Sequence, residues 1–443
     1  MDYYLETLGC PKNLVDGQGM ARELERMGHQ AVDDPGRAQV LIVNTCGFIQ
    51  DARRESLDTL RRLARAKRRG QWLIAAGCLS QYWGQALAGR IPGVDALLGT
   101  RRWSEIGALL TDLEARPARR GRDPLALLGD PLEAAEAGAP GYASQGASAY
   151  LKIADGCSAP CAFCAIPLIK GPAASRPAEA IAAEAAALVR RGTREMVLIA
   201  QDTTAYGRDR GQPDALPGLI ETVLAAAPDL RWLRLMYAYP GHVSPRLIER
   251  MAADPRICHY LDLPLQHAHP DVLRRMKRPA DVDRTRRLID DLRAAMPDLA
   301  LRSSFIVGYP GESQAEFQVL LDFLEEVRFD RVGVFRYSPE QGTPAAALSE
   351  PVPEEVKAER YERLMSLQQE ISRALNAGQV GRTLDVLVEG QGDGLSIGRT
   401  YRDAPEIDGL AFFPGEWPMG RFVPVRITGA MEYDLLGETQ NGA

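Results

Sequence analysis

Residues 156–167 read Gly156-Cys157-Ser158-Ala159-Pro160-Cys161-Ala162-Phe163-Cys164-Ala165-Ile166-Pro167. The three cysteines follow the spacing C-x-x-x-C-x-x-C, and thiolates are the usual ligands of iron-sulfur clusters. Three cysteines in one compact loop can bind three irons of a cubane cluster, which leaves the fourth iron open for a cofactor or substrate. The stretch therefore predicts a [4Fe-4S] cluster held by Cys157, Cys161 and Cys164.

Two other interpretations of this loop are weaker. A disulfide framework needs an oxidising compartment and an even number of cysteines, whereas the chain has 7 cysteines and opens without the pattern of a secretion signal. A structural zinc site needs a fourth ligand, and after Cys164 no Cys or His follows until His242. The cluster remains the favoured interpretation.

Length and composition indicate a globular protein of several domains. The 443 residues correspond to roughly three domains of ~150 residues, and 45% of them are hydrophobic and 25% charged. No apolar run approaches the ~20 residues of a membrane helix, so we expect a cytoplasmic protein with no membrane partner. The net charge of −6 disfavours broad coating of nucleic acid, and the basic run 61–69 is interpreted as a solvated helix face.

Four segments of different pattern follow one another along the chain. Residues 1–110 alternate short apolar strands with helical runs and predict a small α/β domain, and the Ala-, Gly-, Pro- and Arg-rich residues 111–148 are interpreted as a linker. Residues 149–375 alternate strand and helix and predict an open (β/α)6 partial TIM barrel, ending in a helix over 354–376. Residues 376–443 predict a small all-β module. The expected strands are 3–5, 40–44 and 72–76, then 150–153, 196–200, 232–236, 260–263, 303–307 and 331–335, and finally 383–388, 409–413, 422–427 and 432–435.

Three further cysteines each follow an expected strand of the N-terminal domain. They occur in the segments Leu8-Gly9-Cys10-Pro11, Asn44-Thr45-Cys46-Gly47 and Ala76-Gly77-Cys78-Leu79. Parallel strands end at the same edge of a sheet, so these cysteines can converge, and an adjacent glycine lets the backbone approach a bulky cluster. Each cysteine alone could be a small buried residue, but the repetition predicts a second cluster. Cys258 has no such partners and is expected in the core.

These residues carry a family resemblance. The loop from Cys157 to Cys164, with Phe163 before the last cysteine, resembles the signature of radical S-adenosylmethionine (SAM) enzymes, and the two cysteine triplets together resemble the methylthiotransferases. The segment Ser303-Ser304-Phe305-Ile306-Val307-Gly308-Tyr309-Pro310-Gly311-Glu312 is similar to the fifth barrel strand of that family. The resemblance spans nearly the whole chain and implies an N-terminal cluster domain, a radical SAM barrel and a C-terminal, OB-like TRAM domain. It also implies two [4Fe-4S] clusters and SAM as cofactors.

The resemblance further implies a reaction. The barrel cluster would cleave SAM to a radical that removes hydrogen from an unactivated carbon, which no general base could deprotonate at neutral pH. The cluster on Cys10, Cys46 and Cys78 would deliver sulfur, and a second SAM would supply the methyl group. The long linker suggests that the two cluster domains adjust to each other on binding.

Several side chains beyond the cysteines are candidates for the site. Polar residues after barrel strands in this superfamily face the methionyl part of SAM, and these are Gln201, Asp202 and Gln266, although turn capping is an equal alternative. His267 and His269 are interpreted as surface histidines at a helix start rather than as ligands.

The family has two branches with different substrates. One modifies the β-carbon of an aspartate in small-subunit ribosomal protein twelve and the other modifies adenosine in transfer RNA. The segment Thr7-Leu8-Gly9-Cys10-Pro11-Lys12-Asn13-Leu14-Val15-Asp16 is similar to the ribosomal-protein branch, although Gly17-Gln18 and Lys170 depart from its usual residues.

Charge favours the same branch. Residues 376–443 hold five arginines and ten acidic residues, a net charge of −5 that would repel RNA phosphates and suit a basic ribosomal protein, unless the acidity serves only solubility. We expect that protein as substrate, free or on the assembled subunit, and an electron donor such as flavodoxin or ferredoxin. A transfer-RNA methylthiotransferase with the same two clusters and a non-enzymatic iron-sulfur scaffold remain the alternatives.

Overall fold

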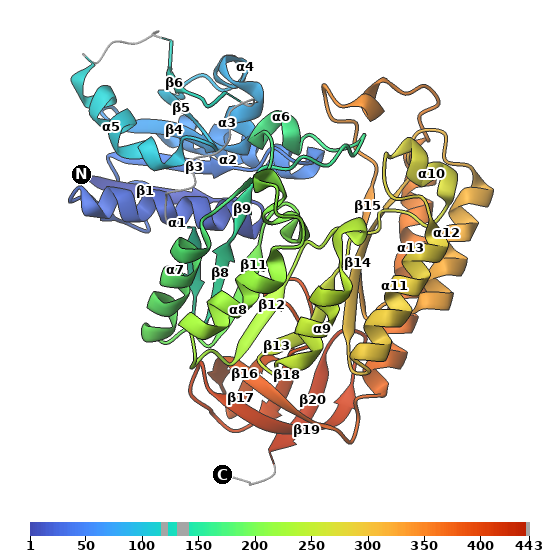
Figure 1. Cartoon of the computed structure of the whole chain (residues 1–443). Helices are drawn as coiled ribbons and strands as arrows, with labels where there is room; N and C mark the ends of the chain where they lie inside the picture. Colours follow the sequence, from blue (N-terminus) through green and yellow to red (C-terminus); the bar gives the residue numbers. More distant parts are fainter. Residues whose placement is uncertain (117–122, 131–140, 440–443) are drawn as a thin grey trace.

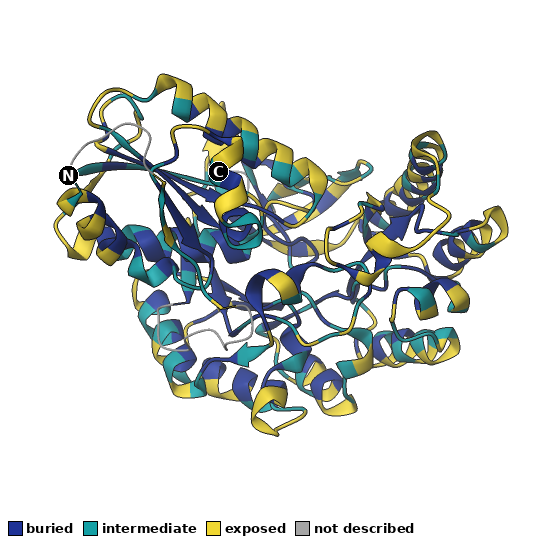
Figure 2. Ribbon diagram, turned by 90° about the horizontal axis from the view of Figure 1, so that it is seen from above, coloured by how far each residue is buried: buried dark blue, intermediate teal, exposed yellow. Residues whose placement is uncertain are grey.

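A computed structural model describes residues 1–116, 123–130 and 141–439 of the chain. Three sheet-based units follow one another in space, with the N-terminal domain at one end, the central barrel in the middle and the C-terminal module at the other end (Figure 1). Buried residues run along the strands, and exposed residues lie on the outer faces of the helices (Figure 2). This layering agrees with the predicted α/β and all-β pattern.

The N-terminal domain is a parallel sheet with helices on both faces. The strand order is β2-β1-β3-β4-β5-β6. Alternate residues of β3 point to opposite faces, so Val40 and Ile42 join one apolar core while Leu41 and Val43 join the other. The strands are β1 (Asp2–Thr7), β2 (Gln30–Ala31), β3 (Val40–Thr45), β4 (Trp72–Gly77), β5 (Ala96–Gly99) and β6 (Leu125–Leu127). The helices are α1 (Pro11–Arg26), α2 (Gln50–Ala66), α3 (Cys78–Trp83), α4 (Gln85–Arg90) and α5 (Ile106–Ala115), with a short 3-10 turn η1 (Trp103–Glu105).

Part of the segment interpreted as a linker, 111–148, is regular structure. It contains the end of α5, and β6 adds to the N-terminal sheet by pairing in parallel with β5. Strand β7 (Tyr142–Gln145) pairs antiparallel with the first barrel strand. β6 has only three residues and β7 has four, two of them polar, so both lack the longer apolar run that identifies a buried strand in a sequence. The remaining linker residues, 117–122 and 131–140, lie outside the described residues.

The central barrel is an open sheet of parallel strands with β7 at one edge. The order β15-β14-β13-β12-β11-β8-β7 confirms the six parallel strands predicted from the sequence. They are β8 (Ser148–Lys152), β11 (Glu195–Ile199), β12 (Trp232–Leu235), β13 (Ile257–Asp262), β14 (Ala300–Val307) and β15 (Arg331–Arg336). The helices are α6 (Ile166–Lys170), α7 (Ala178–Arg190), α8 (Leu216–Ala226), α9 (Pro245–Ala253), α10 (Pro270–Arg275), α11 (Val282–Ala295), α12 (Gln314–Val327) and α13 (Glu354–Ala377). Two short strands, β9 (Ala154–Asp155) and β10 (Ala174–Ser175), form a separate antiparallel pair. The 3-10 turns are η2 (Thr203–Ala205), η3 (Arg208–Arg210), η4 (Pro240–His242) and η5 (Pro344–Ala347).

The C-terminal module is a closed barrel with the order β16-β17-β18-β20-β19. Its strands are β16 (Thr383–Gly392), β17 (Leu395–Arg399), β18 (Ala411–Pro414), β19 (Phe422–Ala430) and β20 (Leu435–Thr439). The sequence reasoning missed β17 and expected the last strand at 432–435, whereas β20 begins at Leu435. The residues before it form a turn, in which the Met431 N–H donates to the Asp434 carbonyl. The module is all-β as expected, but β17 was missed and the last strand was placed too early in the sequence.

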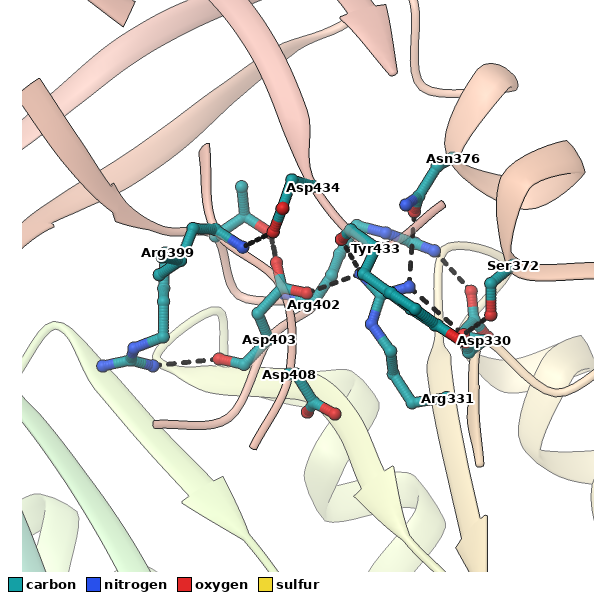
Figure 3. A network of polar contacts seen from close by, with 12 residues as sticks. Asp330, Arg331, Ser372, Asn376, Arg399, Arg402, Asp403, Asp408, Tyr433 and Asp434 are labelled. Carbon is teal, nitrogen blue, oxygen red and sulfur yellow. Dashed lines mark hydrogen bonds and ion pairs between the residues drawn. The ribbon is translucent and has the colours of Figure 1, made fainter. Parts of the chain in front are cut away.

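Buried ion pairs join this module to the bottom of the central barrel (Figure 3). Arg331 of β15 binds Asp403 at 2.7 Å, and Arg402 binds Asp330. Arg399 of β17 and Arg234 of β12 both bind Glu195, whose side chain is fully buried. Burial would raise the pKa of Glu195, but the two guanidinium groups lower it to about 2. The carboxylate is therefore ionised and ties the two units together.

Three smaller expectations can also be checked. The basic run 61–69 lies at the end of α2 and just after it and is mostly exposed, as expected of a solvated face. Cys258 is 3% exposed and packs in an apolar cluster with Tyr150 and Tyr260, which confirms a core role. Among the described residues, no helix is both long and apolar enough to span a membrane.

Candidate functional site

Cys10, Cys46 and Cys78, here called the N-terminal triad, lie at one edge of the N-terminal sheet, where β1, β3 and β4 end. Cys10 caps α1, Cys46 follows β3 directly, and Cys78 begins α3. Gly9 has φ of +89°, and a Cβ there would lie 2.7 Å from the Cβ and 2.8 Å from the Sγ of Cys46. Glycine is therefore needed for the loops to meet. The charges of Cys10 and Cys46 both act on the Cys78 thiol, so the structure brings these three residues together.

Asn13 connects the three loops of the N-terminal triad. Its Nδ2 donates to the Leu8 carbonyl at 2.9 Å and to the Thr45 carbonyl at 3.0 Å. Its Oδ1 accepts from the Cys78 thiol at 3.4 Å. The sequence reasoning gave Asn13 no role, because nothing in a single sequence shows that one amide reaches the ends of three strands.

Cys157, Cys161 and Cys164, here called the barrel triad, lie in the loop after β9 at the C-terminal rim of the central barrel. The thiols act electrostatically on one another. The Ala159 N–H donates to the Cys157 sulfur at 3.4 Å, and the Ile166 N–H donates to the Cys164 sulfur at 3.5 Å. Such N–H donors favour the thiolate form that binds iron.

Arg278 supplies the equivalent donor for Cys161. Its Nη1 lies 3.7 Å from the Cys161 sulfur, and its guanidinium stacks 4.2 Å from the centre of the Tyr239 ring. The Nη2 donates to the Pro264 carbonyl, which fixes the side chain against the rim. Arg278 lies far from the cysteine loop in sequence, and no motif pointed to it.

The chemistry of both triads fits an iron-sulfur cluster. Burial raises the pKa of Cys46 and Cys157 to about 11 and that of Cys78 and Cys164 to about 12. Such thiols are protonated at neutral pH unless a metal displaces the proton. Within the described part of the chain, no three His, Cys, Asp or Glu side chains are arranged to hold a single metal ion. Thiols that are grouped but too spread for one ion suit a cubane, which binds each cysteine at a different corner.

The N-terminal triad meets the segment that follows the barrel triad at the domain interface. Cys78 packs in one apolar cluster with Ala165 and Ile169, which follow Cys164 closely in the chain. In Figure 1, α6 with these residues lies beside α3 of the N-terminal domain. Cys78 of the N-terminal triad therefore lies at the barrel rim, against the segment that follows Cys164.

A buried square of charges fixes the two domains beside the triads. Lys152 binds Asp16 at 2.6 Å and Asp155 at 3.1 Å, and Lys170 binds Asp16 at 3.2 Å and Asp155 at 3.1 Å. Asp16 belongs to α1 and the other three residues belong to the barrel. Lys170, one of the residues that depart from the usual sequence of the branch, is 1% exposed. Its ion pairs place it in the domain interface.

The other departure also lies at the domain interface. The side chain of Gln18 exchanges hydrogen bonds with the backbone N–H and carbonyl of Ser144. A Cβ on Gly17 would come 2.3 Å from the Thr7 hydroxyl. The expected adjustment of the two domains would have to break this contact and the charge square.

Lys12 occupies the middle of the interface. It follows Cys10 in the first turn of α1, is 6% exposed, and its ammonium lies 3.1 Å from the centre of the Tyr237 ring. Burial lowers the pKa of Lys12, while the charges of Cys10 and Asp262 act in the opposite direction. Tyr237 follows β12 and has φ of +62°. Lys12 therefore reaches from the N-terminal triad to the barrel rim.

A pocket of about 330 Å³ opens beside Cys157. Asp202, Tyr239 and His242 line it, and the Asp202 carboxylate accepts from the Ala205 N–H at 3.1 Å and lies 2.9 Å from Nδ1 of His242. Asp202 thus caps a turn and also borders the pocket. Of the residues that the structure describes, those lining this pocket include neither Gln201 nor Gln266.

Gln266 instead extends the barrel sheet. Its N–H donates to the Ser304 carbonyl at 2.8 Å, and its carbonyl accepts from the Ile306 N–H at 2.8 Å. It does so with φ of +75°, which is unusual for a residue other than glycine.

The interpretation of His267 as a surface residue was wrong. His267 is 2% exposed, and its Nδ1 accepts from the His269 N–H at 2.9 Å. Burial lowers its pKa to about 3, so the ring is neutral. His269 caps α10 by accepting from the Asp271 N–H, which agrees with the expected position at a helix start.

Three family models match the chain in the order of its structural units. "Uncharacterized protein family UPF0004" matches residues 2–99, "Radical SAM superfamily" matches residues 151–324 and "TRAM domain" matches residues 380–439. The matches coincide with the N-terminal domain, the central barrel and the C-terminal module. They confirm the predicted fold class.

Several relatives match nearly the full length of the chain. A protein of Roseiflexus sp. (strain RS-1) is 53% identical over 99% of this chain and 97% of its own length, and its name is ribosomal protein uS12 methylthiotransferase RimO. A protein of Chloroflexus aurantiacus with the same name is also 53% identical and covers 99% of each chain. The chain belongs to the RimO family. Membership confirms the predicted class of enzyme, a radical SAM methylthiotransferase.

Solved structures with low sequence identity share the fold. The radical SAM methyltransferase TsrM from Kitasatospora setae, with tryptophan substrate and a SAM analogue bound, has a TM-score of 0.57 at 13% identity, covering 85% of this chain and 90% of that chain. The cobalamin-dependent SAM radical enzyme OxsB has a TM-score of 0.50 at 11% identity, covering 84% of this chain and 56% of its own. At this identity the similarity concerns the fold alone.

Proposed function

We propose that this chain inserts a methylthio group at the β-carbon of an aspartate in ribosomal protein uS12. The observation that carries the proposal is the packing of Cys78 against Ala165 and Ile169, which brings the N-terminal cysteines to the rim of the barrel that holds Cys157, Cys161 and Cys164. Membership of the RimO family supports the substrate, because the relatives are named for uS12. Two steps, hydrogen removal and sulfur delivery, need two sites that reach one carbon.

The barrel triad would hold one [4Fe-4S] cluster through Cys157, Cys161 and Cys164 and leave one iron free. When bound, this cluster supplies the electron that cleaves SAM and so generates the radical that attacks the substrate. Asp202 would accept a hydrogen bond from a cationic group such as the methionyl amine, since its carboxylate is held beside Cys157. Gln201 and Gln266 are the remaining candidates for polar contacts with SAM at the rim.

The N-terminal triad would hold a second [4Fe-4S] cluster through Cys10, Cys46 and Cys78. Asn13 keeps the three loops at a fixed separation, and Ser56 binds both the N–H and the carbonyl of Cys46. This rigidity holds the sulfur-delivering site against the barrel rim. The two triads thus have the same kind of ligand but different proposed roles, SAM cleavage at the barrel triad and sulfur delivery at the N-terminal triad.

The C-terminal module would help to bind the basic substrate protein. Burial of Arg399, Arg402, Asp403 and Asp408 at the barrel interface removes two charges of each sign and leaves three arginines and eight acidic residues. Of these eight, Asp385, Glu406 and Glu432 bind residues of the barrel unit at the edge of the interface. An acidic surface attracts a basic partner and repels RNA. We place the reaction in the cytoplasm, with uS12 free or on the assembled subunit and a flavodoxin or ferredoxin as electron donor.

The test is anaerobic reconstitution with iron and sulfide, followed by incubation with SAM, a reductant and purified uS12. Mass spectrometry of uS12 should show one added methylthio group. Replacing Cys157, Cys161 and Cys164 by alanine should abolish formation of 5′-deoxyadenosine. Replacing Cys10, Cys46 and Cys78 should spare it but prevent the mass increase.

Two outcomes would contradict the proposal. Loss of 5′-deoxyadenosine in the N-terminal triple variant would refute the division of labour. Modification of transfer RNA in place of uS12 would instead support the adenosine-modifying alternative.

A further inference from the structure

Lys12 is a buried cation at the interface between the N-terminal domain and the barrel. It is 6% exposed, and its ammonium contacts the face of the Tyr237 ring. Among the described residues, no hydrogen bond or ion pair joins it to an acidic side chain. Burying an ammonium group without an anionic partner destabilises the protein, so this position favours the binding of an anion.

The neighbouring charges are already matched. Lys152 and Lys170 each bind both Asp16 and Asp155, so this square of two cations and two anions is balanced. Asp262 binds Arg302 at 2.7 Å and accepts from the Tyr237 N–H at 3.1 Å, and Arg302 also approaches Asp408. Each of these carboxylates thus has a cationic partner, and among the described cations named here only Lys12 has no direct ion pair.

The position of Lys12 fits a substrate side chain. On one side it follows Cys10 closely in α1, and on the other it lies over Tyr237, at the C-terminal end of β12. Tyr237 is partly exposed, so the rim is open to solvent at this point. In parallel barrels substrates enter at the C-terminal rim. An anionic group that enters beside Tyr237 would meet the Lys12 ammonium.

We infer that Lys12 binds the side-chain carboxylate of the substrate aspartate and thereby positions the neighbouring β-carbon between the two triads. The inference rests on the proposed function, since it assigns a carboxylate of that substrate to this residue. A charged hydrogen bond to the carboxylate selects aspartate over asparagine by about 10- to 100-fold in affinity. The competing role for Lys12 is to balance the thiolate charge of a cluster on Cys10.

The test measures binding rather than turnover. The protein with both clusters reconstituted is titrated by calorimetry, without reductant, with uS12 and with uS12 carrying asparagine at the target aspartate. Lys12→Met removes the charge at nearly constant length, and Lys12→Arg keeps it. Lys357→Met is the matched control, because Lys357 is also buried beside a tyrosine, Tyr337, but is already paired with Glu354. Bound iron and SAM affinity are measured for each variant.

The expected result is that the wild type and Lys357→Met prefer the aspartate form by about 10- to 100-fold, Lys12→Arg keeps part of this preference and Lys12→Met has none. A preference that survives in Lys12→Met would overturn the inference, and loss of iron with an intact preference would assign Lys12 to the cluster. A fall in SAM affinity alone would assign it to the carboxylate of SAM. If the wild type modifies uS12 yet binds both forms equally, only this inference fails; if it does not modify uS12, the proposed function fails as well.

Discussion

The two triads carry the same three ligands but are built in opposite ways. The barrel triad lies within one loop of eight residues, from Cys157 to Cys164, and each of its sulfurs receives an N–H donor from nearby backbone or from Arg278. The N-terminal triad gathers single cysteines from the ends of three strands, and Asn13 joins them. The first depends on local loop geometry, whereas the second exists only if a whole sheet has formed.

This difference predicts different sensitivities to mutation. The barrel loop can hold its cysteines together wherever β8 and β9 present it. The N-terminal triad requires that Gly9, Asn13 and the register of three parallel strands are all correct. A change at a residue other than the three cysteines should therefore remove the cluster from the N-terminal site and leave the barrel cluster bound.

The largest expected effect is that of Gly9→Ala. The new Cβ would clash with Cys46 and occupy a backbone conformation with φ of +89°, so the Cys10 and Cys46 loops would separate. We expect loss of about half of the bound iron and of all methylthio transfer, with SAM cleavage retained. Iron analysis and assay of 5′-deoxyadenosine check this.

Gly28→Ala is the control for Gly9→Ala. Gly28 has nearly the same φ, +87°, but no atom lies within 4 Å of its added Cβ. In this variant only the backbone conformation is strained, so both clusters should be retained. Equal iron loss in the two variants would show that strain, and not the contact with Cys46, empties the site.

The same comparison explains what could be predicted from sequence. The six parallel strands were predicted correctly, because apolar runs are local signals. The ligand role of Cys157, Cys161 and Cys164 was predicted from their spacing, another local signal, and stays a prediction. The N-terminal triad was found only because three glycine-flanked cysteines repeat after strands. Asn13 and Arg278 were missed, since their roles arise from contacts between residues that the fold brings together. Strands β6 and β7 were missed because their pairing partners, not their own composition, make them strands.

Arg278→Met should change only the barrel site. The guanidinium donates toward the Cys161 sulfur, and its charge stabilises the reduced, more negative cluster. A charged hydrogen bond is worth roughly 1.5–3 kcal/mol, which is about 60–130 mV for one electron. We expect the midpoint potential of the barrel cluster to fall by about this amount, measured by redox titration in a variant that lacks the N-terminal triad.

Arg275→Met is the matched control for Arg278→Met. Arg275 also belongs to the α10 region, but its guanidinium binds Glu316 at 3.0 Å rather than a cysteine. It should leave the potential nearly unchanged. A shared shift in both variants would indicate a general loss of positive charge and not a specific contact with Cys161.

The smallest difference between the triads is expected in their response to pH. Burial raises thiol pKa values to about 11 and about 12 in each triad, so both must release protons when a cluster binds. Because thiolates bind iron, retention of each cluster against a chelator should increase from pH 7 to pH 9, by up to about tenfold per pH unit for each proton released. The alanine triple variants isolate one site at a time, and iron retained at each pH gives the two slopes. Slopes of opposite sign would mean that thiol ionisation does not control cluster binding at one of the two sites. The two triads would then share their cysteine ligands but not the way in which they bind a cluster.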